Sequence, residues 1–106
     1  MSQYIPLCQT ADVPEGEMKA FQVEGRRILV ANVSGTYYAL DALCPHEEGY
    51  LDEGDLDEET VVCPIHYARF SLKTGKLLEG PAEADATVYA VRVADGTVYV
   101  NLKGRS

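Results

Sequence analysis

Hydrophobic and polar residues alternate in short segments at both ends of the chain. Residues 86–102 contain two alternating runs on either side of an Asp-Gly dipeptide, which is typical of a two-residue β-hairpin turn. Residues 17–25 also alternate, and the β-rich run 26–35 ends in Ser-Gly directly before a second such run, 36–43. No long segment has helical periodicity, so the pattern predicts an antiparallel all-β fold.

The middle of the chain differs from its ends. Residues 44–81 are acidic and rich in glycine, and their apolar runs are short. A lobe of roughly 38 residues is smaller than a hydrophobic core usually supports alone, so we expect it to depend on a metal. The predicted architecture is one domain, 1–106: a β-sandwich or barrel made by residues 1–43 and 82–106, with an inserted lobe at 44–81.

The charge of the chain narrows its possible partners. The formal net charge is −8 over 106 residues, which argues against nucleic acid or an anionic membrane surface and favours a partner with a basic docking face. No apolar run approaches the roughly 18 residues of a membrane span, and the first residues do not resemble a secretory signal, so a cytoplasmic protein is expected. Eight of the thirteen residues 47–59 are acidic; they form either a docking surface or simply a solvated loop.

Cysteine and histidine are concentrated in two similar tetrapeptides. Cys44 and His46 form C-x-H, and Cys63 and His66 form C-x-x-H sixteen residues later. The third cysteine, Cys8, lies far from both pairs and is expected to be a buried free thiol. In a reducing compartment such a set indicates metal binding or catalysis rather than a disulfide framework.

The spacing of these ligands favours a binuclear iron centre over zinc. Structural zinc sites usually take two cysteines from one element and two histidines from another, whereas here each loop supplies one of each. Two thiolates on one iron and two imidazoles on the other are the ligands of a Rieske [2Fe–2S] cluster. A zinc-stabilised interaction module is the alternative.

Residues 44–81 resemble the cluster-binding lobe of Rieske-type ferredoxins, the small electron carriers of bacterial ring-hydroxylating oxygenases. The similarity includes GYLDEG after the first pair and RFSLKTGKLLEGPA after the second. It implies one [2Fe–2S] cluster, with Cys44 and Cys63 on a buried iron and His46 and His66 on an outer iron near the surface. It also implies a one-electron carrier, not an enzyme, whose partners are a flavin-dependent ferredoxin reductase and a terminal oxygenase.

The sequence differs from that of respiratory Rieske proteins, and these differences favour the ferredoxin type. Respiratory Rieske proteins carry an extra cysteine in each loop, where this chain has Gly49 and Ile65, and hydroxyl-bearing residues where it has Ala68 and Phe70. The missing donors predict a reduction potential near the low end of the Rieske range. A small subunit of a larger reductase, such as a nitrite reductase, remains the second hypothesis.

Overall fold

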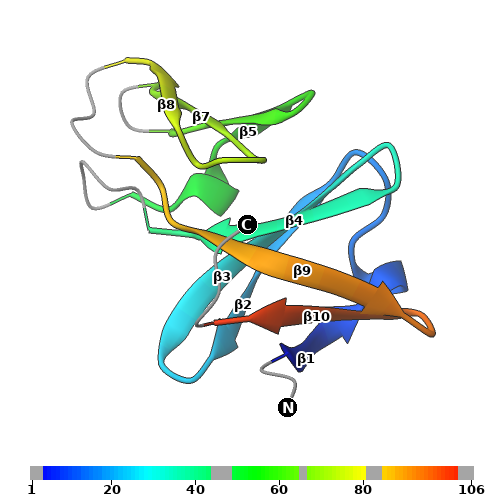
Figure 1. The fold of residues 1–106 in the computed structure, drawn as a ribbon. Coiled ribbons are helices and arrows are strands. Elements are labelled where there is room, and N and C mark those ends of the chain that lie inside the picture. The colour runs from blue at the N-terminus through cyan, green and yellow to red at the C-terminus, as the bar shows by residue number, and fades with distance from the viewer. Residues whose placement is uncertain (1–3, 44–48, 65–66, 81–84, 103–106) are drawn as a thin grey trace.

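The computed structural model describes residues 4–43, 49–64, 67–80 and 85–102, and these residues form two antiparallel sheets (Figure 1). The larger sheet has the order β1-β10-β9-β4-β3-β2. Its strands are β1 (Tyr4–Gln9), β2 (Met18–Val23), β3 (Arg26–Val33), β4 (Thr36–Asp41), β9 (Val88–Ala94) and β10 (Thr97–Asn101). The two outermost strands, β1 and β2, also contact each other, so the sheet is nearly closed into a barrel.

The smaller sheet lies above one end of the larger one (Figure 1). It has the order β5-β6-β7-β8, and each strand has three residues. These strands are β5 (Asp55–Asp57), β6 (Thr60–Val62), β7 (Arg69–Ser71) and β8 (Leu77–Glu79). The sheet therefore falls within the segment expected to form the inserted lobe, and the prediction of an all-β fold is confirmed.

Two-residue turns explain the hairpins of the larger sheet. The β9–β10 turn has positive φ at Asp95 (50°) and Gly96 (76°), and the β3–β4 turn has positive φ at Ser34 (53°) and Gly35 (88°). Positive φ at both central residues is the requirement of a type I′ turn, whose twist matches that of the flanking strands. Both hairpins were predicted from these dipeptides.

One hydrophobic core joins the two sheets. Fully buried Leu29 and Leu40 of the larger sheet belong to the same cluster as Val61 and Phe70 of the smaller one. The lobe thus shares a core with the barrel in addition to any support from a metal. The helical pieces within the described residues are two three-residue 3-10 turns, η1 (Thr10–Asp12) and η2 (Leu51–Glu53), and none is long and apolar enough to cross a membrane.

Candidate metal centre

Cys63, the described member of the second predicted ligand pair, directly follows β6 in the β6–β7 hairpin. The Cys63 amide donates to the Ala68 carbonyl at 2.8 Å and continues the strand ladder one residue beyond β6. The Tyr67 amide donates to the Cys63 carbonyl at 3.0 Å, which closes a tight loop. Tyr67 has φ of 60°, an uncommon conformation for an aromatic residue that tends to be found at functional sites.

Exposure changes sharply across this hairpin. Cys63 is fully buried, whereas Tyr67, four residues later, is 71% exposed. His66 lies between them in sequence and is outside the described residues. The first residue of the β6–β7 loop, Cys63, therefore lies in the core, and Tyr67, where the chain turns back toward β7, lies at the surface.

The first ligand pair is also flanked by paired backbone. Leu43 and Tyr50 form an isolated antiparallel bridge, and one residue further out the Leu51 amide donates to the Ala42 carbonyl at 2.6 Å. Exposure rises from 0% at Ala42 to 53% at Leu43. Cys44 and His46, the predicted ligands of this loop, lie outside the described residues.

Two glycines allow the segments around the loops to approach closely. A Cβ on Gly54 would overlap the Val62 carbonyl oxygen and lie 3.1 Å from the Cδ of Pro64, so the chain leaving the first loop packs against the second. Gly80 has φ of 110°, and a Cβ there would lie 2.6 Å from the Ala68 Cα. Side chains larger than hydrogen at either position would separate these segments.

The surroundings of Cys63 suit a metal-bound thiolate. Its neighbours in the core cluster include Leu51, Ala68 and Phe70, all fully buried and apolar. An unpaired thiolate would be costly there, whereas one bound to a metal ion has its charge compensated. No group of three or more metal-binding side chains occurs among the described residues, which contain one of the four predicted ligands.

Ala68 and Phe70 stand where respiratory Rieske proteins have hydroxyl-bearing residues, and both lie inside the protein. Ala68 and Phe70 are fully buried, and Phe70 pairs across the small sheet with Val61 and Leu77. Neither side chain can donate a hydrogen bond. Phe70 is therefore a core residue.

Several acids of the 47–59 segment pair with cations of the small sheet and its turns. Asp57 lies 2.8 Å from Arg69, and Glu59 lies 3.8 Å from Lys73 and 3.3 Å from the Tyr38 hydroxyl. These acids lie around the β5–β6 turn, at the opposite end of β6 from Cys63. Ion pairing within the lobe therefore accounts for part of the acidic run.

Cys8 lies in β1 and is half-buried. Burial, with a smaller contribution from the charge of Asp12, raises the pKa of its thiol from 9.0 to about 11. The neutral thiol is thus the stable form at neutral pH.

We expect Cys8 to react slowly with iodoacetamide at pH 8. Alkylation requires the thiolate, and a pKa two units higher leaves roughly 100-fold less of it than in an ordinary thiol. Because the pKa is raised, the rate should keep increasing with pH up to about 11. Mass spectrometry of the holo-protein measures the rate, with Cys8→Ala as the blank; a rate plateau near pH 9 would contradict the shift.

The described residues thus form a nearly closed antiparallel barrel and a small sheet whose β6–β7 loop begins at a buried cysteine. The family model of the Rieske [2Fe-2S] domain matches residues 3–96. The chain belongs to the Rieske [2Fe-2S] family.

Individual relatives define the type of Rieske protein. The chain is 42% identical over 100 residues to the 3-phenylpropionate/cinnamic acid dioxygenase ferredoxin subunit of Escherichia coli K12, covering 92% of each. It is similar in structure to the ferredoxin of carbazole 1,9a-dioxygenase from Nocardioides aromaticivorans IC177 (TM-score 0.87, 30% identity, 93% and 97% coverage). It is also similar to a chain in the complex of reduced oxygenase and oxidised ferredoxin of carbazole 1,9a-dioxygenase (TM-score 0.87, 27% identity, 100% and 98% coverage).

These comparisons confirm several predictions made from the sequence. The chain is a Rieske-type ferredoxin of the ring-hydroxylating dioxygenase kind, an electron carrier with one [2Fe–2S] cluster rather than an enzyme. The zinc module and the reductase subunit are not favoured. The ligand assignment to Cys44, His46, Cys63 and His66 stays a prediction, because Cys63 alone is described.

Sequence reasoning missed one contact of the segment that follows the first ligand loop. Arg27 at the start of β3 forms an ion pair with Asp52 of η2. Asp52 belongs to the acidic run that was interpreted as a docking or solvated segment. No local pattern marks Arg27, because its partner is 25 residues away.

Proposed function

We propose that this ferredoxin accepts single electrons from a flavin-dependent reductase and delivers them to the terminal oxygenase of a ring-hydroxylating dioxygenase system. Cys44 and Cys63 hold one iron of the cluster, and His46 and His66 hold the other. The bound cluster supplies the one-electron couple.

The exposure gradient of the second loop is the observation that carries this assignment. Cys63 is fully buried, and the residue that follows His66 is largely exposed. A buried cysteine side and a surface histidine side fit the ligand arrangement that the family resemblance implies. Electrons would then enter and leave through the histidine side, where a partner can approach.

Exposed apolar side chains border both ligand loops. Leu43 precedes Cys44, and Tyr67 follows His66. Their exposed area is small, which suits the weak and short-lived complexes of electron carriers, with less than about 1,200 Å² in the interface. The relative in the oxygenase–ferredoxin complex supports an oxygenase as the partner. We also expect Pro81 at this contact; it lies outside the described residues.

Acidic side chains near the first loop would guide the encounter with a basic partner. Glu47 and Glu48 directly follow His46 in the sequence; both lie outside the described residues. We expect Glu47→Lys combined with Glu48→Lys to slow oxygenase reduction roughly 3- to 10-fold at low ionic strength, because charges at the rim of an interface act mainly on the association rate. The cluster spectrum should not change. Stopped-flow mixing of reduced ferredoxin with oxidised oxygenase measures this rate.

A matched control variant separates the effect of charge at Glu47 and Glu48 from the effect of net charge on the rate of oxygenase reduction. Glu15→Lys with Glu58→Lys makes the same change in net charge at two exposed positions, and Glu58 lies at the β5–β6 turn, away from Cys63. This control should reduce the oxygenase at nearly the wild-type rate, and about 0.5 M salt should remove most of the difference between the two variants. Equal slowing in both variants, or none in either, would show that Glu47 and Glu48 are not docking residues.

A further inference from the structure

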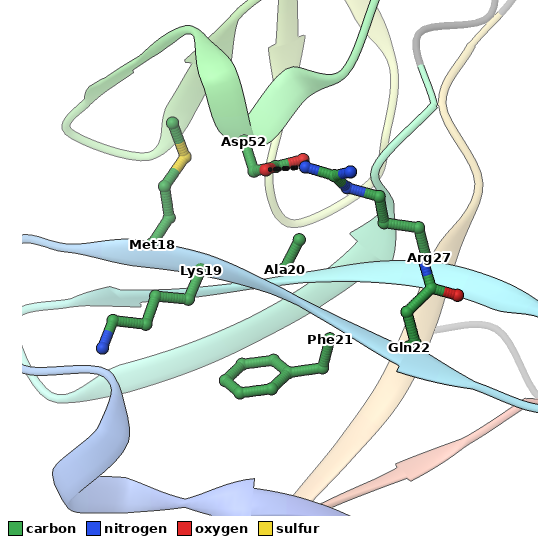
Figure 2. A pocket seen from close by; sticks show the side chains of 7 residues that line it. All are labelled: Met18, Lys19, Ala20, Phe21, Gln22, Arg27 and Asp52. Atoms are coloured by element: carbon green, nitrogen blue, oxygen red, sulfur yellow. Dashed lines mark hydrogen bonds and ion pairs between the residues drawn. The ribbon is translucent and has the colours of Figure 1, made fainter.

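Arg27 reaches from the barrel to the segment that leaves the first ligand loop. Its Nη2 lies 2.7 Å from Oδ2 of Asp52 and its Nε lies 3.3 Å from Oδ1, so the guanidinium binds both carboxylate oxygens. Figure 2 shows this pair spanning from β3 to η2, and both side chains line a pocket of about 440 Å³ together with side chains of β2. Such two-pronged pairs fix orientation as well as distance.

The same guanidinium lies against an aromatic ring at the end of the loop. The Cζ atom of Arg27 is 4.0 Å from the centroid of the Tyr50 ring. Tyr50 in turn bridges Leu43, the residue directly before Cys44. Arginine is suited to this position because its planar group can stack on a ring and pair with a carboxylate at once.

The backbone of Arg27 holds the other end of the loop. Its carbonyl accepts a hydrogen bond from the Ala42 amide at 2.9 Å, and the Ala42 carbonyl accepts one from Leu51. One residue therefore contacts the chain entering the loop through its backbone and the chain leaving it through its side chain. Both ends of the loop therefore contact β3, an inner strand of the larger sheet.

Burial makes the ion pair more than a surface contact. The side chain of Asp52 is 11% exposed and that of Arg27 is 31% exposed. The hydrogen bond to Asp52, the largest cause, raises the pKa of the Arg27 guanidinium above its usual range. A carboxylate this shielded would be left without compensation if Arg27 were removed.

We propose that Arg27 is a positioning residue that, with Asp52 and Tyr50, holds the two ends of the first ligand loop in place. The proposal rests on the ligand assignment of Cys44 and His46 given above. Groups that orient metal ligands commonly change metal affinity 10- to 100-fold when they are removed. Arg27 acts through the loop ends and not by contact with the cluster.

Arg26 provides a matched control. It is the preceding residue of the same strand, and its Nη1 lies 3.4 Å from the Tyr89 hydroxyl and 3.3 Å from the Leu102 carbonyl. Arg26→Met removes the same charge as Arg27→Met without touching the Asp52 pair. Arg27→Lys keeps the charge but cannot form the two-pronged contact. Asp52→Asn removes the negative charge of the partner, and so weakens the contacts among Arg27, Asp52 and Tyr50, here called the clamp.

Three measurements on the holo-protein test the clamp. In Arg27→Met we expect the Leu51 amide to exchange hydrogen about 10-fold faster, while β3 and β4 keep wild-type protection. Chelator should bleach the cluster about 10-fold faster. The electron paramagnetic resonance lines of the reduced protein should broaden, because the loop ends sample more positions. Arg27→Lys and Asp52→Asn should show the same changes more weakly, and Arg26→Met should match wild type within about twofold.

Several results would overturn the proposal. Equal behaviour of Arg27→Met and Arg26→Met would mean that charge or general stability alone is involved. Wild-type behaviour of Arg27→Lys would mean that the two-pronged contact is unnecessary. Faster bleaching without faster Leu51 exchange would exclude action through the loop ends. A preparation without iron and sulfide would count against the ligand assignment. In that case the hydrogen exchange rate of the Leu51 amide in the folded chain would still test the clamp.

Discussion

Cys63→Ser is expected to yield protein with no [2Fe–2S] cluster, whereas the wild-type chain should be red-brown and contain two irons and two labile sulfides. Cys63 is fully buried directly after β6, and the other described cysteine, Cys8, lies in β1 of the other sheet and in a different core cluster, so it cannot replace Cys63. A serine hydroxyl is a hard, neutral donor at neutral pH and a poor substitute for a soft thiolate. Iron and sulfide assays with the visible absorbance spectrum measure the loss, and His66→Ala should give the same result.

Loss of the cluster should also loosen the small sheet. Each of its strands has three residues, too short for independent stability, although Val61 and Phe70 remain anchored in the shared core. We therefore expect faster hydrogen exchange across residues 55–79, with the β3–β4 and β9–β10 hairpins still protected.

Cys8→Ser is the matched control for this experiment. Cys8 lies in β1, remote from the β6–β7 hairpin in the sheet order, so its replacement should leave the iron and sulfide content unchanged. One zinc per chain without sulfide, in protein produced with ample iron, would contradict the cluster assignment.

The hairpins of the barrel could be predicted because their signals are local. Asp95-Gly96 and Ser34-Gly35 have the positive φ values that their composition favours, and the alternating runs beside them became paired strands. The ligand set was inferred for a different reason and stays a prediction. Paired soft donors at fixed spacing carry chemical information that does not depend on the fold.

Contacts between distant segments could not be predicted. The Arg27–Asp52 pair depends on where η2 lies relative to β3, and the approach of Gly80 to Ala68 depends on how β8 meets the second loop. Three-residue strands are too short to show a hydrophobic period. The core shared by the two sheets could not be predicted either, because it depends on which residues of the lobe pack against those of the barrel.

The sign of the effect at Ala68 and Phe70 follows from the chemistry of hydrogen bonds. A donor aimed at a cluster or ligand sulfur stabilises the more negative, reduced state and raises the potential. A hydrogen bond to a charged group is worth about 1.5–3 kcal/mol. For one electron, two such bonds correspond to at most roughly 130–260 mV out of a Rieske range of about 450 mV.

Surface acids have a smaller effect on the potential. One carboxylate about 10 Å away contributes about 0.4 kcal/mol in water, or some 20 mV, before salt screening. Several described acids are also paired with cations, as Asp52 is with Arg27 and Asp57 with Arg69. The absence of two hydroxyl donors should therefore dominate, and the wild-type potential should lie near the low end of the Rieske range.

Ala68→Ser combined with Phe70→Tyr is expected to raise the potential by a substantial part of that upper bound. Both positions are fully buried, so a new hydroxyl must find an acceptor or destabilise the fold by about 1–3 kcal/mol. A rise in potential with little loss of stability would show that the hydroxyls bond to the cluster or its ligands. Phe70→Leu, which alters the core without adding a donor, is the control and should shift the potential far less. Voltammetry and urea unfolding measure the two quantities, and an unchanged or lower potential in a folded double variant would refute the hydrogen-bond explanation.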